Sequence, residues 1–542
     1  MNRMIRTSSL ALAISVGWVL PAQAAAAQNA DVAAQLAAMQ AQLERLSQRV
    51  DTLEGQLDTA NARAAAAEQQ AAAAITTADA AKTALAAAPA PSVAAKPATE
   101  IAWDGAPRLT TKDGFSFKPR GRLHFDVGTI SSPGSFESPN LGTRIRMRRL
   151  RLGFEGTVPG GFGYKAEADL ANGAVAFGDV VITYTPAKLP VQLRVGNFET
   201  LNSLEQISSS NFNTFIERAA FNDAFVNARR LGGALSWHSK DSDWRAEAGL
   251  FAAHSIDSSL DNDGWIGAGR LVFAPKFPGG QLHFGINYQY RDFASNAGGV
   301  SSTGVGMPAT NQLARYRARP NSQLTDVRFV DTGSFAAHSD QILGLEVAGV
   351  FKSLHFSGEA QWLRAKAYQA GELATGQDAF SGGNLAVVPA GQPAFFGAYG
   401  EVGYFLTGET RGYRRGDGIW ARTKVMHPLG KGGIGAFQLS ARFEYLDLND
   451  DSLVNGPTNN FSTGALNLAP LSTRLGRGGK QTSYLLGLNW YPVDYVRAMI
   501  NYGRVNVTGG PIASQVDPAS MAPVNQRDYG VNLLQTRLQF DF

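Results

Sequence analysis

The sequence is notable first for what it lacks. It has no cysteine in 542 residues, which excludes a disulfide framework, a thiolate zinc site, an iron–sulfur cluster and a cysteine nucleophile. No interior stretch of ~20 apolar residues exists to form a spanning helix. Only 17% of residues are charged and the net charge is +4, too weak a basic bias to indicate a nucleic-acid partner. These absences, together with 59 glycines, argue against an ordinary soluble enzyme and against a disordered chain.

Motifs for catalysis are also missing. The seven histidines are scattered over different segments, and no G-x-S-x-G, H-E-x-x-H or phosphate-loop pattern occurs. We therefore expect no enzymatic activity, no metal site and no cofactor.

The N-terminus has the three parts of a secretory signal. Arg3 and Arg6 precede an apolar core at residues 10–20, and a small-residue cleavage site follows at residues 22–24. The apolar core is short for a membrane span, so we expect a signal peptide at residues 1–24. An uncleaved anchor is the alternative.

The next two segments are helical and then low in complexity. Between residues 25 and 70, apolar residues recur at alternating spacings of four and three over about four heptads, which predicts a periplasmic α-helical coiled coil. A lone amphipathic helix is the alternative, and the seam does not fix the number of strands in the coil. Residues 71–111 are rich in alanine and then proline, which predicts a linker.

From residue 112 to residue 542 the pattern is that of strands with two unlike faces. In residues 281–291 apolar and aromatic side chains alternate with polar ones, and the C-terminal residues 534–542 alternate in the same way and end on Phe542. Segments of ~10 to 13 residues are long enough to cross a bilayer at a tilt. They are joined alternately by short turns and long connections. This predicts an all-β transmembrane antiparallel β-barrel, with about seventeen segments leaving 16 or 18 strands open.

The face opposite the aromatic side chains should line the lumen. Its basic members are the predicted pore-lining residues Lys118, Arg120, Arg122, Lys165, Arg245, Arg291 and Arg442. Acidic residues are interspersed, so we expect a modest anion preference; alternatively, the pairs only bridge across the lumen and stiffen the wall. The long connection 199–228 is the candidate for a loop that enters the pore.

Arginines at residues 144–151 break the alternation. Strict alternation places Arg148 on the lipid side, where an arginine at mid-bilayer costs ~2–4 kcal/mol. Either a β-bulge at Arg148–Arg149 turns both side chains inward, or Arg148 faces a neighbouring subunit. Arg144 and Arg146 fit strand-end contacts with lipopolysaccharide phosphates better.

Four blocks resemble the phosphate-selective porin O and P family. They are RRLRLGFEGTVPGGFGYKAEADLANG at 148–173, LRVGNFETLNSLEQISSSNFNTFIERAAF at 193–221, FLTGETRGY at 405–413 and LGLNWYPVDYVRAMINY at 486–502. The resemblance implies a 16-stranded outer-membrane barrel, a homotrimer and a loop folded into the pore. It also implies that Arg148 and Arg149 contact the anion at the constriction, that Arg218 lies in the binding region, and that Arg151 is one inward step along from the pair.

The resulting hypothesis is an outer-membrane porin for passive diffusion of small anions, phosphate or phosphorylated solutes, with its coiled coil in the periplasm. Its expected partners are the anionic solute, two further copies of the chain, and outer-membrane lipid and lipopolysaccharide. The alternative is a structural tether, in which the barrel anchors a coiled coil that binds the cell wall.

Overall fold

The structure is a computed structural model that describes residues 99–542 with internal gaps, together with residues 65, 69, 72 and 76. The gaps are 172, 174, 226, 254–255, 257–263, 294–312, 368–379, 382–383, 386–390, 454–457, 461–464 and 468–477. The expected signal peptide and nearly all of the expected coiled coil therefore lie outside the described residues. None of the helices in the described part is long and apolar enough to cross a membrane.

Sixteen long antiparallel strands form the barrel wall in the described part of the chain. They are β3 (Ser116–Ile130), β4 (Gly142–Val158), β5 (Phe162–Asp169), β6 (Ala176–Tyr184), β7 (Val191–Glu199), β8 (Arg229–His238), β9 (Trp244–Ala252), β10 (Trp265–Phe273), β12 (Gly280–Asp292), β16 (Phe335–Phe351), β17 (Leu354–Ala367), β20 (Ala394–Phe405), β23 (Ala436–Asp447), β26 (Lys480–Val493), β27 (Val496–Thr508) and β28 (Asp528–Asp541). Each pairs with the next, and β28 pairs with β3, from Leu533↔Ile130 to Asp541↔Arg122, which closes the sheet. The choice between 16 and 18 strands is thus settled at 16.

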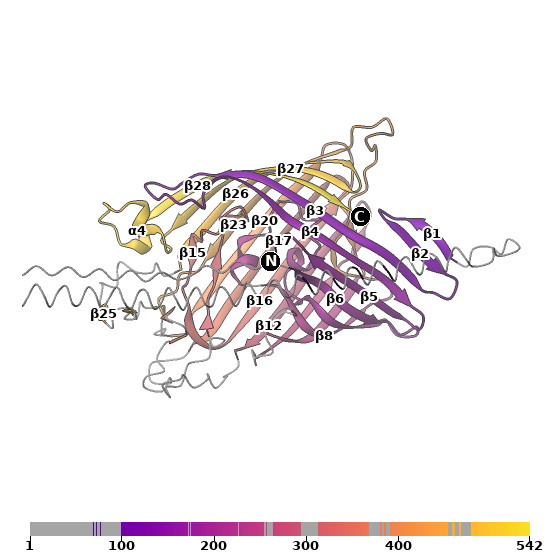
Figure 1. Ribbon diagram of the computed structural model, residues 1–542, viewed down its shortest axis with the longest axis horizontal. Helices are drawn as coiled ribbons and strands as arrows, with labels where there is room; N and C mark the ends of the chain where they lie inside the picture. The colour runs from indigo at the N-terminus through magenta and orange to yellow at the C-terminus, as the bar shows by residue number, and fades with distance from the viewer. Residues whose placement is uncertain are drawn as a thin grey trace, which may run out of the picture. The chain divides into compact units, whose positions relative to one another are not determined.

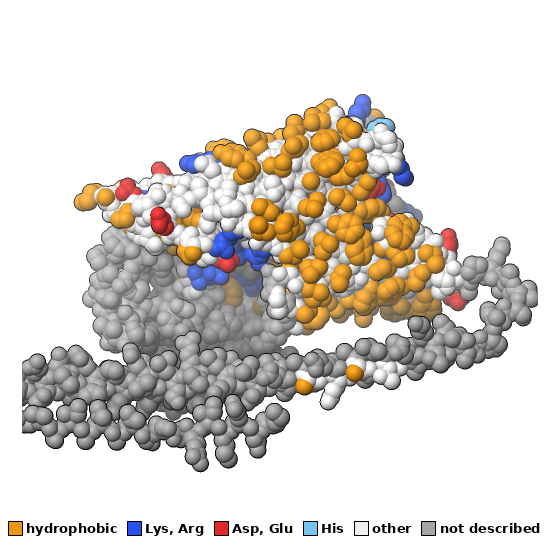
Figure 2. Space-filling model, turned by 45° about the horizontal axis from the view of Figure 1, so that its top comes forward, with side chains coloured by type: hydrophobic (Ala, Val, Ile, Leu, Met, Phe, Trp, Pro, Cys, Tyr) orange, Lys and Arg blue, Asp and Glu red, His pale blue; other side chains and the backbone are white. Residues whose placement is uncertain are grey.

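Burial in the wall is the reverse of burial in a soluble protein. On β28, Leu538 and Phe540 are 56% and 41% exposed, whereas Arg537 and Gln539, which alternate with them, are 2% and 3% exposed. The outer surface accordingly carries a broad cover of hydrophobic side chains (Figure 2). This confirms the alternation predicted from the sequence: apolar side chains face out and polar ones face the interior.

The remaining elements are short. They are β1 (Thr99–Trp103), β2 (Pro107–Thr111), β11 (Lys276–Phe277), β13 (Leu313–Ala314), β14 (Arg317–Ala318), β15 (Val330–Asp331), β18 (Phe380–Ser381), β19 (Asn384–Leu385), β21 (Tyr413–Arg414), β22 (Ile419–Trp420), β24 (Thr458–Asn460), β25 (Ala465–Asn467), α2 (Leu204–Ile207), α3 (Ala220–Ala224), α4 (Ala513–Val516) and the 3₁₀ helix η3 (Val524–Gln526). β1 and β2 form a hairpin that pairs with the start of β3 (Figure 1). Both strands of this hairpin lie inside the range 71–111 expected to be linker.

Short turns join the strands at one end of the barrel and long connections join them at the other. In the turn between β4 and β5, Gly160 and Gly161 have φ angles of 95° and 91°, a conformation that side chains with a Cβ disfavour. One connection breaks the rule. Residues 406–435, between β20 and β23, lie at the short-turn end but number thirty, and they contain β21 and β22.

Candidate functional site

A β-bulge at Arg148 turns the side chains of both Arg148 and Arg149 toward the interior of the barrel. The register of β3 and β4 shifts between His124↔Arg149 and Phe125↔Met147, which leaves Arg148 as the extra residue. Arg149 is 5% exposed, and Arg148 donates through Nε to the Glu217 carboxylate at 3.0 Å. The bulge predicted from the cost of a lipid-facing arginine is confirmed.

Residues 200–228 lie against the inner wall of strands far away in sequence. The α2 backbone N–H groups of Leu204 and Glu205 donate to the Glu359 carboxylate of β17 at 2.8 and 2.9 Å. The backbone N–H of Ile216 donates to Asn501 of β27 at 2.8 Å. Ser203 caps α2 by accepting from the backbone N–H of Gln206. These bonds hold the segment inside the barrel.

Arg218 organises this segment from within. Its guanidinium donates to the backbone carbonyls of Glu205, Gln206 and Ser208 at 3.0, 3.1 and 3.0 Å. These are carbonyls that the one-turn helix α2 and the residue after it leave without helical partners. Arg218 therefore fixes the shape of the segment through hydrogen bonds to neutral carbonyls.

Glu217 joins the segment to strands β4 and β28 of the wall. It accepts from Arg148 and, at 2.9 Å, from Arg537 of β28. Burial alone would raise the pKa of Glu217, but the nearby charges of Arg148, Arg537 and Arg149 outweigh it and hold that pKa well below its ordinary value. Glu217 is therefore a carboxylate at neutral pH.

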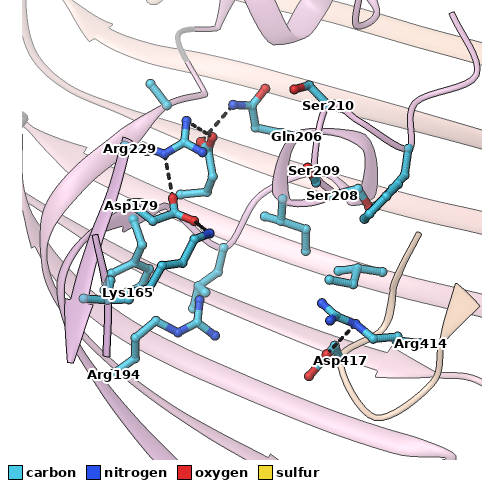
Figure 3. A pocket seen from close by; sticks show the side chains of 18 of the residues that line it. Lys165, Asp179, Arg194, Gln206, Ser208, Ser209, Ser210, Arg229, Arg414 and Asp417 are labelled. Carbon is cyan, nitrogen blue, oxygen red and sulfur yellow. Dashed lines mark hydrogen bonds and ion pairs between the residues drawn. The ribbon is translucent and has the colours of Figure 1, made fainter. Parts of the chain in front are cut away.

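A cavity of about 460 Å³ lies between strands β3–β9, residues 200–228 and the hairpin β21–β22 (Figure 3). Basic side chains outnumber acidic ones in its lining. The basic residues are Arg120, Arg122, Arg149, Arg151, Lys165, Arg194, Arg218, Arg229, Arg245 and Arg414; the acidic ones are Asp179, Glu199, Glu247 and Asp417. Ten cations against four anions leave the lining with a formal excess of six positive charges.

Most of these cations are held by carboxylates. Arg229 contacts Asp179 and Glu199 at 2.7 and 2.8 Å, and Lys165 also pairs with Asp179. Figure 3 shows Lys165, Asp179 and Arg229 together on one side of the cavity, with Arg414 and Asp417 on another.

The cations nearest the bulge share two further carboxylates. Arg151 contacts Glu167 and Asp169 at 2.9 and 2.7 Å, and Arg122 reaches Glu167 at 3.2 Å. These pairs fix the positions of the two cations, and the two carboxylates formally balance their charge.

Arg149 differs from the other cavity-lining arginines of β3 and β4, because its described partner is neutral. Its Nη1 lies 3.3 Å from Nδ1 of His124, whose Nε2 contacts the Asn211 side-chain oxygen at 3.2 Å. A ring that donates from Nε2 and accepts at Nδ1 is an uncharged imidazole. Among the described residues no carboxylate lies within 4.0 Å of Arg149, and its buried Nε has no hydrogen-bond partner. A buried guanidinium with unused donors is a place for an anion.

The connection 406–435 enters the barrel from the short-turn end and meets the segment 200–228. The backbone N–H of Trp420 donates to Ser208 Oγ at 3.1 Å. Arg245 and Arg270 donate to the carbonyls of Gly416 and Gly418 at 2.8 and 2.9 Å, which ties the hairpin to the wall. Two inserted segments thus meet beside the cavity, and the sequence indicated only the one from the long-loop end.

The structure brings together most, but not all, of the predicted site residues. Those that line the cavity are Arg120, Arg122, Arg149, Arg151, Lys165, Arg218 and Arg245. Four others lie outside its lining. Arg148 pairs with Glu217, Lys118 with Asp104 at 3.3 Å, Arg291 with Asp340, and Arg442 with Glu205.

Arg442 is an inward arginine whose charge is enclosed by carboxylates. It is 4% exposed and contacts the carboxylates of Glu205, Glu401 and Glu444 at 2.5, 2.5 and 3.2 Å. Its guanidinium also lies 4.7 Å from the ring centre of Phe215. This arginine anchors the inserted segment to β20 and β23.

Sequence reasoning missed Arg194, Arg229 and Arg414. Arg194 follows from the alternation of β7, since Leu193 and Val195 on either side are exposed outward. Arg229 does not, because it shares its parity with the outward Leu231. Arg414 belongs to the hairpin β21–β22, whose inward position no sequence pattern indicated.

Comparison with known proteins identifies the family of this barrel. The family model described as phosphate-selective porin O and P matches residues 117–542. The chain belongs to the phosphate-selective porin O and P family. It is therefore an outer-membrane β-barrel porin, as the resemblance of the four blocks implied.

Two relatives of this porin match over most of their length. An uncharacterised protein of Caulobacter vibrioides is 35% identical over 465 residues, covering 84% of this chain and 80% of the relative. Porin O of Pseudomonas aeruginosa is 28% identical over 414 residues, covering 72% and 83%.

Among solved structures, the anion-selective porin from Comamonas acidovorans matches with a TM-score of 0.43 at 10% identity, covering 79% of this chain and 100% of that one. The outer membrane channel DcaP of Acinetobacter baumannii matches with a TM-score of 0.42 at 12% identity, covering 80% and 99%.

Proposed function

We propose that this porin conducts small anions, phosphate and phosphorylated solutes among them, and that the cavity beside Arg149 is its anion site. The observation that carries the proposal is the excess of cations in the cavity lining together with the buried, uncompensated guanidinium of Arg149. A charge held in a partly desolvated site attracts a counter-ion far more strongly than it would in water.

The donor set suits an oxyanion. Arg149 presents a guanidinium group, which matches phosphate oxygens with two parallel hydrogen bonds, while Arg151, held by Asp169 and Glu167, adds its charge to the same lining. Ser208 and Ser210 also line the cavity, and their hydroxyl oxygens accept from the backbone N–H of Trp420 and from Arg122. Each hydroxyl hydrogen thus stays available to donate to an anion that has shed water.

In this proposal residues 200–228 form the constriction. The segment is tied to the wall at Glu359 and Asn501, so its position does not depend on a solute. Arg218 keeps its shape and adds a charge to the cavity, while Arg148 acts through Glu217 to hold the segment beside Arg149. A permeating solute must also leave, so we expect several weak sites in series along the other cations that line the cavity.

Assembly and surroundings complete the proposal. We infer a homotrimer from the family resemblance. Arg144 and Arg146 at the long-loop end are the proposed contacts for lipopolysaccharide phosphates; Arg144 also donates to Asn140 at 3.0 Å and Arg146 to the Gln323 carbonyl at 2.6 Å. The proposed coiled coil, and with it the tether alternative, lies outside the described residues.

Single-channel recording of the purified porin in a planar bilayer tests the function. Reversal potentials under a salt gradient should show a preference for chloride over potassium, and added inorganic phosphate should block the chloride current. Replacing the guanidinium in Arg149→Gln should weaken this block by about tenfold, because one charge-assisted contact contributes ~1.5–3 kcal/mol.

The matched control is Arg291→Gln. Arg291 is also an inward arginine, but it pairs with Asp340 and does not line the cavity. Phosphate block should be unchanged in this variant. A cation-selective wild-type pore would refute the function, and equal block in both variants would refute the site.

A further inference from the structure

The cavity lining contains an apolar surface that an inorganic phosphate does not use. Val181 of β6, Ile207 and Phe212 of the segment 200–228, and Ile419 of β22 all line it and are half-buried rather than buried. Three of these four side chains come from the two inserted segments.

This surface is not the result of poor packing in the inserted segments. Leu204 and Phe215 of the same segment, and Trp420 beside Ile419, are 0%, 2% and 2% exposed. The chain therefore buries its apolar side chains elsewhere in these segments and leaves Ile207, Phe212 and Ile419 facing the cavity. Apolar surface kept open in a concave site is typical of ligand recognition.

The size of the cavity leads to the same conclusion. About 460 Å³ falls in the range of ~300–1,000 Å³ typical of sites for small organic molecules. It corresponds to the space of ~15 water molecules at ~30 Å³ each, of which one phosphate ion displaces only a few.

Resting on the proposed function, we propose that the cavity is a binding site for organic anions that join an apolar group to a phosphate or similar oxyanion. The oxyanion lies with Arg149, and the apolar group lies against Ile207, Phe212 and Ile419. Burial of ~60 Å² of apolar surface at ~25 cal/mol per Å² corresponds to about tenfold tighter binding.

The test compares two phosphate monoesters of equal charge, methyl phosphate and phenyl phosphate. Chloride current through the full-length porin in a planar bilayer is measured while each is added, and the concentration that halves the current is recorded. Phenyl phosphate should half-block at about a tenfold lower concentration than methyl phosphate. Equal values for the two esters would overturn the inference while leaving the anion site in place.

Variants locate the apolar contact. The double variant Ile207→Thr, Ile419→Thr keeps branched side chains but removes apolar surface, so the ratio between the two esters should fall to about threefold or less, with block by methyl phosphate unchanged. The matched control, Ile207→Val with Ile419→Val, keeps the surface apolar and should retain most of the ratio.

Each remaining outcome is decisive. A high ratio that persists in the threonine variant would overturn the assigned contact. Absence of block by inorganic phosphate and by both esters would refute the proposed function, and this inference with it. Open-channel conductance of each variant reports whether it has folded, and the comparison of esters in the wild-type porin needs no variant.

Discussion

Two sides of this barrel use arginine and carboxylate side chains for different purposes. On the side of β3–β9, ten cations meet four anions around an open cavity, and the described partner of Arg149 is a neutral imidazole. On the side of β20 and β23, Arg442 is enclosed by three carboxylates and aromatic rings. The difference teaches that the number of lumen arginines says little about an anion site. Charge that is left unbalanced next to empty space is what matters.

The largest effect should follow from removing the enclosed arginine. In Arg442→Leu, Glu205, Glu401 and Glu444 lose their shared cation, and breaking a buried ion pair on one side typically costs ~3–5 kcal/mol. We expect the temperature at which the folded barrel is lost on a semi-native gel to fall clearly, with noisier open-channel current. Arg194→Leu, which removes a more exposed arginine, is the control and should change the temperature little. Equal temperatures for all three proteins would contradict the structural role of Arg442.

A smaller, purely electrostatic effect should follow on the cavity side. Arg229→Gln leaves Glu199 facing the cavity without its described cation and leaves Asp179 with Lys165 alone, so the preference for chloride over potassium should drop several-fold. Arg194→Gln is the comparison, because Glu247 keeps Arg245 at 2.8 Å. Its reversal potential should shift less. If the two variants shift alike, the balance of charge around the cavity is not what sets selectivity.

Glu217 lies between the two sides, and its pKa predicts how the porin responds to acid. Because its pKa is lowered in the folded protein, the stability it contributes is fully present above its ordinary value of 4.5 and is lost only as the pH falls through the folded-state value. Phosphate block recorded from pH 8 to pH 5 should therefore show no step that is absent from Glu217→Gln. A step found only in the wild-type porin would mean that the ion pairs with Arg148 and Arg537 do not hold the charge.

The smallest effect should come from Arg414. It lines the cavity, but its side chain is 61% exposed and pairs with Asp417 at 2.9 Å. Exposed ion pairs contribute ~0–1 kcal/mol, so Arg414→Gln should weaken phosphate block by no more than about fivefold. A loss of phosphate block as large as in Arg149→Gln would show that the hairpin β21–β22, rather than β4, supplies the main contact with phosphate.

The wall of the barrel could be predicted from the sequence because each wall residue faces one of two solvents. Strand alternation gave the inward cations Arg120, Arg122 and Lys165, and the cost of an arginine in lipid reduced the position of Arg148 to two alternatives, of which the structure shows the bulge. Both arguments concern a single side chain and its surroundings, which a sequence displays directly.

The inserted segments could be predicted only in part. The length of 200–228 marked it as a candidate, but its anchors on Glu359 and Asn501 join residues more than 150 positions apart and leave no local pattern. Residues 406–435 were missed because the turns at their end of the barrel are otherwise short. Arg229 was missed because it is the first residue of β8, where the chain leaves the inserted segment, and it does not follow the strand's alternation.

The hydrogen bond from Trp420 to Ser208 joins a segment that arrives from one mouth of the barrel to a segment that arrives from the other. Exchanging either segment alone for that of a relative removes half of a fitted pair. Transplanting solute preference between members of the family therefore calls for moving residues 200–228 and 406–435 as a unit.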